Sequence, residues 1–269
     1  MGDGNIRLEW RNRVALMILD RPDRHNAFNE TMWSALERTV GELSGNLPRA
    51  VVITGSGGSF CAGMDVNPDN PQITELADAL TRCDRGPVEA LIRRIRGAVD
   101  KLCDLGAPLI AALNGNAYGG GAELACRCDI RMMDPRAAIC FSEVRLGLMP
   151  DWGGAVGLTR LVGPGRAADM VLSGRKVGAE EAFRMGLADR VSQPGRAVDE
   201  AMELAATIAA NGPRAVRHAL RVIRGVPGLD YPAALELETR EAVDLIAGGE
   251  CVTGIAAFLE KKKPDFLDI

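Results

Sequence analysis

Short apolar runs of strand length alternate with segments of helical periodicity through the first two thirds of the chain. The runs lie at 6–10, 14–19, 50–55, 109–113, 130–133 and 138–142. Between them, apolar residues within 32–43 and 91–102 recur every three or four positions, and Asn29 is placed to cap the first of these helices. Because strands separated by helices usually pair in parallel, the alternation predicts an α/β fold with parallel strands.

The last third of the chain has helical patterns only. They cover 198–210, 213–223, 232–246 and 251–259, with Gly/Pro turns between them. We therefore divide the chain into an α/β body, 1–195, and a helical C-terminal region, 196–269. The segment 67–87 contains three prolines and no clear period, which predicts a long mobile loop.

Composition narrows the classes of function. The chain has 269 residues, of which 47% are hydrophobic, and a net charge of −4. Without a basic stripe, neither nucleic acid nor an acidic membrane is expected as a partner. No apolar run approaches the ~20 residues of a membrane span, and no secretory signal is visible at the start, so we expect a cytoplasmic protein.

Cysteine and histidine usage argues against a metal site. The seven cysteines form no CxxC pair and mostly lie inside apolar runs, which predicts reduced, buried thiols. The two histidines, His25 and His218, are far apart in the sequence, so the chain offers few histidines for a zinc site or a Ser-His-Asp triad. No metal is expected.

Two carboxylates, Glu123 and Glu143, each follow a segment that is expected to fix the path of the backbone. Glu123 comes just after three glycines at 119–121, which suggest that backbone comes close to a ligand or to other backbone. Glu143 follows the apolar run 138–142. Such a pair can divide general acid and general base work. The alternative for Glu123 is a solvated residue in the first turn of a helix that packs tightly on a strand.

The glycine-rich turn at 55–65 follows a strand but matches no nucleotide-binding motif. It lacks the Gly-Lys-Ser/Thr ending of a phosphate loop and the GxGxxG spacing of a dinucleotide fingerprint. What remains is a turn whose free N–H groups can bind a ligand oxygen. The N–H of Gly120, at the predicted start of the helix that carries Glu123, can bind a ligand oxygen in the same way. There the helix dipole adds positive potential.

Several motifs occur in a fixed order along nearly the whole chain. They are DRP at 20–22, SFCAGMD at 59–65, AALNGNAYGGGAEL at 111–124, CDI at 128–130, EVRLGL at 143–148, LSG at 172–174 and FLEKKKPDF at 258–266. Together they resemble the enoyl-CoA hydratase/isomerase (crotonase) family. The resemblance implies a crotonase-like spiral of repeated β-β-α turns, a helical C-terminal region used in trimer assembly, and a homotrimer or homohexamer.

The resemblance also implies an acyl-CoA thioester substrate. The backbone N–H groups of Met64 and Gly120 match the family's oxyanion hole, which holds the thioester oxygen as enolate charge develops on it. Glu123 and Glu143 match the two glutamates of the hydratases: Glu123 takes a proton from the water that attacks C3, and Glu143 delivers a proton to C2. No metal or redox cofactor is implied, since coenzyme A is part of the substrate.

Two residues depart from the Pro-Gly-x-Gly-Gly stretch that is usual after the second glutamate in hydratases. Asp151 stands where glycine is common and resembles the catalytic aspartate of some double-bond isomerases in the family. Its alternative role is the N-cap of a helix predicted at 152–161. For Trp152 three roles are open: it narrows the acyl pocket, it stacks against an aromatic or conjugated acyl group, or it packs at an interface.

Further residues match positions that bind coenzyme A in the family. Those expected near the bound adenine and pantetheine are Arg24, His25, Ala27, Ala62 and Asp65. Phe258 and Lys261 resemble residues that reach the nucleotide of a neighbouring subunit. For Lys261, a solvated charge run at a helix end is the alternative.

These features favour an enoyl-CoA hydratase that adds water to a trans-2-enoyl-CoA and gives a 3-hydroxyacyl-CoA, as in fatty acid β-oxidation. Two alternatives stay open. One is an enoyl-CoA or dienoyl-CoA double-bond isomerase that uses Glu143 and Asp151. The other is an acyl-CoA binding protein without turnover, because membership of a family does not fix the chemistry.

Overall fold

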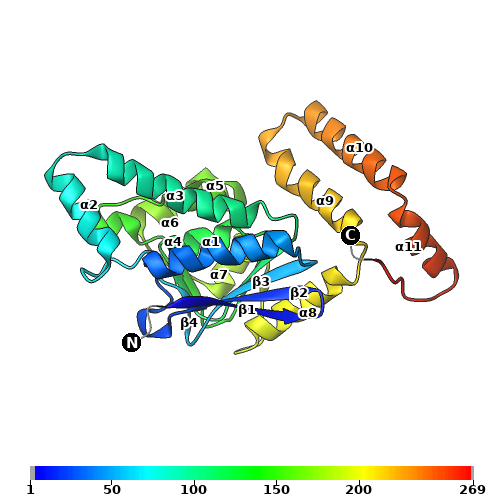
Figure 1. Ribbon diagram of the computed structural model, residues 1–269, viewed down its shortest axis with the longest axis horizontal. Coiled ribbons are helices and arrows are strands. Elements are labelled where there is room, and N and C mark those ends of the chain that lie inside the picture. Colours follow the sequence, from blue (N-terminus) through cyan, green and yellow to red (C-terminus); the bar gives the residue numbers. More distant parts are fainter. Residues whose placement is uncertain (1–3, 268–269) are drawn as a thin grey trace.

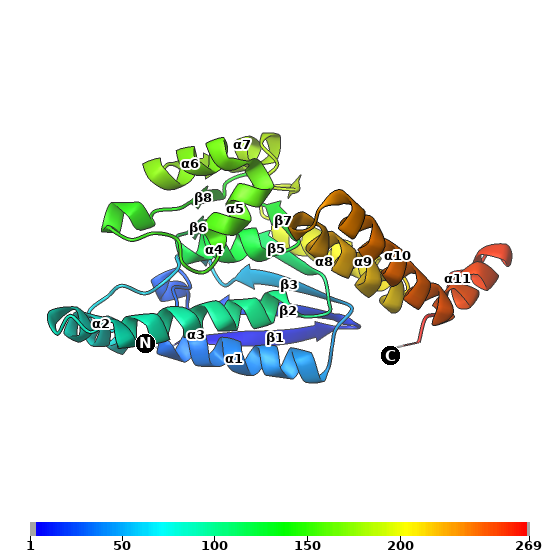
Figure 2. The same ribbon diagram turned by 90° about the horizontal axis from the view of Figure 1, so that it is seen from above.

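The computed structural model describes residues 4–267 and contains two sheets surrounded by helices (Figure 1, Figure 2). The larger sheet has the order β1-β2-β3-β5-β7-β10, and the smaller has the order β4-β6-β8-β9. The strands of the larger sheet are β1 (Asn5–Arg11), β2 (Val14–Asp20), β3 (Ala50–Gly55), β5 (Leu109–Leu113), β7 (Ile130–Met133) and β10 (Arg190–Val191). Those of the smaller sheet are β4 (Ser59–Cys61), β6 (Asn116–Tyr118), β8 (Ala138–Cys140) and β9 (Lys176–Gly178).

Helices connect the strands and make up most of the described part of the C-terminal region. The α-helices are α1 (Glu30–Gly45), α2 (Pro71–Thr81), α3 (Arg85–Cys103), α4 (Gly120–Arg127), α5 (Gly154–Val162), α6 (Pro164–Ser173), α7 (Ala179–Arg184), α8 (Ala197–Ala209), α9 (Pro213–Gly225), α10 (Tyr231–Ala247) and α11 (Glu250–Leu259). Short 3-10 turns lie at η1 (Pro22–Arg24), η2 (Glu143–Leu146) and η3 (Val226–Gly228).

The chain adds one strand to each sheet in turn, followed by helix. β3 and β4 precede α2 and α3, β5 and β6 precede α4, and β7 and β8 precede α5. The pairings β2·β3, β3·β5, β5·β7 and β7·β10 are parallel, as are β4·β6 and β6·β8. The predicted α/β class and the spiral of β-β-α turns are therefore confirmed.

The central strands are apolar on both faces because helices cover the sheet on both sides. In β3, Val51 and Ile53 belong to the main core, which α1 and α3 also enter, whereas Ala50 and Val52 join a second cluster with Met202 of α8. This is the two-residue alternation of a strand, seen with both faces buried. α8 therefore covers the sheet although it follows residue 196, while α9, α10 and α11 extend away from the body (Figure 1, Figure 2). The division at residue 196 stays a prediction.

The prediction of a mobile loop at 67–87 is wrong. The segment contains α2 and the start of α3. The side chain of Asn70 caps α2 by accepting from the N–H of Gln72, and Asp84 caps α3 in the same way. Pro71 and Pro87 are compatible with this because they lie in the first turns of the two helices, where their missing N–H groups have no helical partner to lose, and Pro68 precedes α2. The apolar period of α2 was missed because the prolines of this segment favour a loop.

No single helix among residues 4–267 is both long and apolar enough to cross a membrane. Only α10 and α11 taken together reach the required length and composition, and they are bent by 71° at the break between them.

Candidate active site

Glu123 lies in the first turn of α4 and is almost fully buried, with 1% of its surface exposed. The glycines before it let α4 start close to neighbouring backbone. Gly119 has φ 52° and ψ −129°, a conformation open to glycine, and a Cβ on Gly121 would collide with the carbonyl of Cys61 in β4. The solvated alternative for Glu123 is thus wrong, although the tight packing of helix on strand that accompanied it is correct.

The Glu123 carboxylate accepts three backbone hydrogen bonds from the segment before α5. Oε2 accepts from the N–H groups of Trp152 and Gly154, each at 2.8 Å, and Oε1 accepts from the N–H of Asp151 at 3.1 Å. Burial raises the pKa of Glu123 to about 8, although the hydrogen bond from Gly154 acts in the opposite direction and favours the ionised form. The nearby Glu143 and Asp151 raise it further.

Glu143 begins the 3-10 turn η2 and differs sharply from Glu123. Both of its carboxylate oxygens are shielded from solvent, and neither has a hydrogen-bond partner among residues 4–267. Burial raises the pKa of Glu143 as well. An unpaired buried carboxylate is costly, so this group is placed to bond something that the protein alone does not supply.

Asp151 is not a helix N-cap, so that prediction is wrong. α5 begins at Gly154, and its N-cap is Gly153, which has φ 94° and makes no side-chain cap. The carboxylate that accepts from Gly154 at this helix end is Glu123. Asp151 lies at the mouth of the site, where burial raises the pKa of its carboxyl group.

Two backbone amides, those of Met64 and Gly120, lie near each other at the site. Among the described residues, neither the N–H of Met64 nor that of Gly120 donates to another backbone group. The turn carrying Met64 lies directly against the start of α4, because a Cβ on Gly63 would come within 2.6 Å of the Gly120 nitrogen. Gly63 has φ +86°, a value that also favours glycine. Two free donors at a helix start can hold an oxygen that gains negative charge.

An apolar cavity of about 280 Å³ joins these groups. Glu123, Glu143 and Asp151 line it, as do Met64 and Gly120. The rest of the wall comes mainly from α2, α3 and the segment after η2: Val66, Ile73, Leu76, Leu80, Val88, Leu91, Ile92, Ile95, Leu146, Leu148 and Met149. Three carboxyl groups and two free amides thus line one apolar pocket.

Trp152 closes one side of this pocket from within the protomer. It is 3% exposed and packs edge-on against Phe28 and Trp33, with ring centroids 5.5 Å and 4.7 Å away. Its ring also lies against Gly120, where an added Cβ would approach within 2.5 Å. The ring therefore fixes the position of the Gly120 amide and narrows the cavity.

Comparison with known proteins identifies the family of the chain. The family described as enoyl-CoA hydratase/isomerase matches residues 9–268. The short-chain-enoyl-CoA hydratase of Clostridium acetobutylicum is 33% identical, with 96% of each chain covered, and the crotonyl-CoA hydratase of Syntrophomonas wolfei is 33% identical, with 98% of each covered. The crystal structure of an enoyl-CoA hydratase from Bacillus anthracis aligns with a TM-score of 0.88 at 30% identity, covering 97% of this chain and 98% of the other.

The chain belongs to the enoyl-CoA hydratase/isomerase family.

Within the family's expected coenzyme A loop, the side chains have partners inside the protein. Arg24 pairs with Asp69 at 2.8 Å, and Nδ1 of His25 lies 3.1 Å from the Ser59 hydroxyl. Ala27 is buried, while Ala62 lines the cavity. Their roles toward coenzyme A stay predictions.

Asp65 does not line the cavity of this family member. It is 2% exposed, and its carboxylate lies 2.6 Å from the Arg21 guanidinium and accepts a hydrogen bond from the Asn67 side chain. These bonds hold the pKa of Asp65 below its usual range against the effect of burial. The geometry gives Asp65 a part in holding the turn at 62–65.

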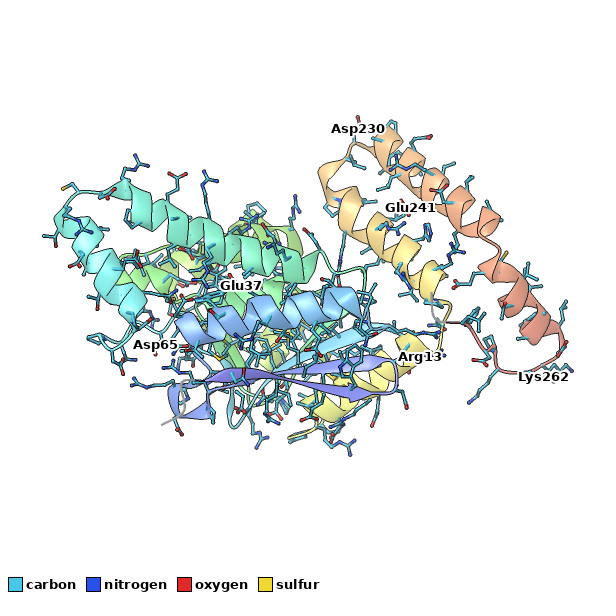
Figure 3. All side chains as sticks on the ribbon, viewed as in Figure 1. Arg13, Glu37, Asp65, Asp230, Glu241 and Lys262 are labelled. Carbon is cyan, nitrogen blue, oxygen red and sulfur yellow. The ribbon has the colours of Figure 1, made fainter. Side chains whose placement is uncertain are left out.

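Phe258 and Lys261 lie far from the cavity of their own protomer. α11 is at the end of the C-terminal region that points away from the body, and the neighbouring Lys262 lies at the opposite end of the molecule from Asp65 (Figure 1, Figure 3). Phe258 is 81% exposed. Any role of these residues in binding coenzyme A therefore requires another subunit.

Sequence reasoning missed the cavity wall from α2 and α3. Ile73, Leu76 and Leu80 recur at helical spacing after Pro71, and this signal was present within the segment interpreted as a loop. It also missed the amides that hold Glu123, because only tertiary structure brings 151–154 to α4. No three His, Cys, Asp or Glu side chains in the described part of the chain are arranged to hold a metal ion.

Proposed function

We propose that this family member is an enoyl-CoA hydratase that adds water reversibly to a trans-2-enoyl-CoA and forms a 3-hydroxyacyl-CoA. One observation carries the proposal: two buried carboxyl groups at the cavity, Glu123 and Glu143, differ in their hydrogen bonding. Hydration needs one group that loses a proton and one that gains it. The hydratase names of the relatives support the same choice.

The hydrogen bonds assign the two roles. Three N–H donors favour a charge on Glu123, whereas no group among residues 4–267 donates a hydrogen bond to the Glu143 carboxyl group, so we place the proton of the pair on Glu143. In the hydration step Glu123 takes a proton from water as its oxygen bonds to C3, and Glu143 gives its proton to C2. Water is thereby divided between the two carbons, and a proton that passes from Glu123 to Glu143 restores the starting state.

The amides of Met64 and Gly120 would hold the thioester oxygen during this step. As water attacks C3, negative charge moves onto that oxygen, and donors already in place stabilise it without rearrangement. Loss of one such donor typically raises the barrier by ~3–4 kcal/mol. The reaction moves only water and protons, so we propose that it needs no metal or redox cofactor.

Asp151 supports a second candidate, a double-bond isomerase. It lines the cavity, has a raised pKa and is not explained by helix capping. A carboxyl group here and Glu143 would then move a proton between two carbons of the acyl chain.

Isotope labelling separates the candidates. The protein is incubated in oxygen-18 water with 2-enoyl-, 3-enoyl- and dienoyl-CoA thioesters, and the products are analysed by mass spectrometry. Incorporation of labelled oxygen into a 2-enoyl substrate supports the hydratase. A moved double bond at constant oxygen content supports the isomerase, and tight binding without product leaves an acyl-CoA binding protein. Roles in β-oxidation and a cytoplasmic location stay predictions.

We further propose a homotrimer or homohexamer built through the C-terminal helices. Large apolar side chains are exposed along them: Ile223, Leu235, Val243, Ile246, Val252, Ile255, Phe258 and Leu259. A surface this apolar favours contact with another chain. Sedimentation velocity should give three or six chains per particle, and a stable monomer would contradict the assembly.

A further inference from the structure

Arg127 lies one helical turn after Glu123 on α4, so the two side chains project from the same face of the helix. Glu123 accepts hydrogen bonds from N–H groups of the segment 151–154 before α5. Arg127 approaches the same segment from a carbonyl group, because its Nη1 lies 3.5 Å from the backbone oxygen of Trp152. One face of α4 therefore contacts both donors and an acceptor of a single short segment.

A partly buried ion pair fixes the Arg127 side chain, of which only 18% is exposed. Its Nη2 donates to Oδ1 of Asp100 on α3 at 2.7 Å. Asp100 also accepts from Arg96, one turn earlier on α3, at 2.9 Å. Because a guanidinium group is planar, it can hold two acceptors in fixed directions at once. Arg127 thus ties the segment before α5 to α3.

This segment depends on such contacts because its own backbone offers little restraint. Residues 149–153 belong to neither a helix nor a strand. Gly153 has φ 94°, a conformation that glycine reaches freely, so the peptide between Trp152 and Gly153 has few steric limits of its own. A Cβ on Gly153 would collide with the Arg127 guanidinium group, so the two residues pack closely. Rotation of this peptide would displace the neighbouring N–H groups that hold Glu123.

We propose that Arg127 is a positioning residue, which holds the segment 151–154 so that its three N–H groups point at the Glu123 carboxylate. The inference rests on the proposed function for the chemistry that Glu123 performs, whereas the restraint itself does not depend on turnover. Arg127 does not line the cavity of the candidate site, so we expect it to make no contact with the substrate. It lines a separate space of about 440 Å³, bounded by α3, α4, α5 and α9.

The charged and titratable groups nearby are Glu143 and Asp151 around Glu123, and Asp100, Cys103, Asp104, Arg96, Arg160 and Arg224 around Arg127. A variant of Arg127 therefore changes a charge as well as a contact. The experiment has to separate these two effects on the pKa of Glu123.

Two variants separate charge from position. Arg127→Met removes a positive charge, which by charge alone raises the pKa of Glu123, and Asp100→Ala removes a negative charge, which by charge alone lowers it. Loss of position acts in one direction in both variants, because amides that no longer point at Glu123 stop stabilising its ionised form. We therefore expect the acidic limb of the kcat/KM profile to move to higher pH in both, by about half a unit or more. Movement in opposite directions would assign the effect to charge and overturn the inference.

The kinetic constants give a second readout. In both variants kcat should fall by about tenfold or more, because a misplaced catalytic group slows the chemical step. KM should stay within about twofold, because no contact with the substrate is lost. Arg127→Lys keeps the charge but not the planar fork, so it should behave like Arg127→Met. Full activity in Arg127→Lys would overturn the inference.

Arg175→Met is the matched control. Arg175 is also paired with carboxylates, Asp169 at 2.6 Å and Glu181 at 2.7 Å, but it lines neither the cavity nor the space around Arg127. Urea unfolding gives the stability of each variant, and Arg175→Met should leave the pH profile unchanged. An equal movement of its profile would make general destabilisation the cause, and the inference would be wrong.

A measurement without turnover distinguishes this inference from the proposed function. Infrared difference titration follows the C=O stretch of the Glu123 carboxyl group as it gains a proton at low pH, and its absence in Glu123→Gln assigns the band. The midpoint should rise in Arg127→Met and in Asp100→Ala. A raised midpoint without hydration of any enoyl-CoA would overturn the proposed function alone. Hydration by the wild type, with unchanged midpoints and pH profiles in both variants, would overturn this inference alone.

Discussion

The Oε2 atom of Glu123 accepts a hydrogen bond from the backbone N–H of Gly154 at 2.8 Å, so a carboxylate of the candidate site also serves the first turn of α5. Glu123 therefore has a structural role in addition to its proposed catalytic role. The fit is tight, since a Cβ on Gly154 would collide with the Glu123 side chain. Glu143 has no such second role, and this difference makes the two glutamates separable by experiment.

Replacement of the two glutamates should affect stability differently. Glu143→Gln should lower kcat by about 10²–10⁴ and leave the free energy of unfolding unchanged or higher, because a buried carboxylate without partners becomes a neutral amide. Glu123→Ala should lower kcat similarly and also destabilise the fold by about 1–3 kcal/mol, because three N–H groups lose their acceptor. Turnover assays and urea unfolding measure both effects. Equal stability of the two variants would contradict the assigned hydrogen bonds.

Stability should depend on pH through Glu123. Burial and the neighbouring carboxyl groups raise the pKa of Glu123 from 4.5 to about 8 on folding because the Glu123–Glu143 pair keeps one proton, so between these values the folded pair holds a proton that the unfolded state has released. Stability from this group is therefore lost as pH rises from about 4.5 to 8. Thermal unfolding of wild type should show this decline, and Glu123→Gln should flatten it. Parallel curves for the two proteins would show that Glu123 does not titrate in this window.

Activity should also fall at high pH. The proposed mechanism needs one proton on the Glu123–Glu143 pair, and the pair titrates as a unit with raised pKa values. The rate kcat/KM should thus decrease above pH 8, where the last proton leaves, and at low pH, where both groups are protonated. A profile that stays level up to pH 10 would exclude a protonated carboxyl group as the donor.

Asp151→Ala should leave the fold almost intact. Because Asp151 caps no helix, we expect a change within about 0.5 kcal/mol. Asp230→Ala is the matched control, since the Asp230 side chain caps α10 by accepting from the N–H of Ala233, and its loss should cost about 1 kcal/mol. Activity then separates the candidate functions: hydration spared and isomerisation lost would assign catalysis to Asp151.

Gly63→Ala should damage the site through backbone alone. The new Cβ would press on the Gly120 nitrogen, and φ +86° is unfavourable for alanine, so both kcat and stability should fall, the latter by about 1–3 kcal/mol. Gly41→Ala in α1 is the control, because its Cβ meets nothing within 4 Å and alanine favours helix by about 1 kcal/mol. Full activity in Gly63→Ala would argue against an oxyanion hole at this contact.

The chain's local patterns were sufficient to predict its class and much of its secondary structure. Strands such as 109–113 are continuous apolar runs of strand length, and Asn29 caps α1 as expected. α2 escaped prediction because the prolines of its segment outweighed the helical spacing of Ile73, Leu76 and Leu80, and Asp151 was misassigned because its position before a helical pattern allows a cap that the actual start at Gly154 does not use. Prolines at 68, 71 and 87 strengthened the wrong choice of a loop.

What the sequence by itself determined was the identity and order of the chemical groups: Glu123 after three glycines, Glu143 after an apolar run, and the motifs that resemble one family. These are local properties, set by neighbours along the chain. Only the tertiary structure decided that three amides hold Glu123 while none among residues 4–267 holds Glu143, that Asp65 is buried against Arg21, and that α2 and α3 line the cavity. Hydrogen bonds, burial and cavity shape depend on segments that are far apart in the sequence. These segments come into contact only when the chain folds into the spiral.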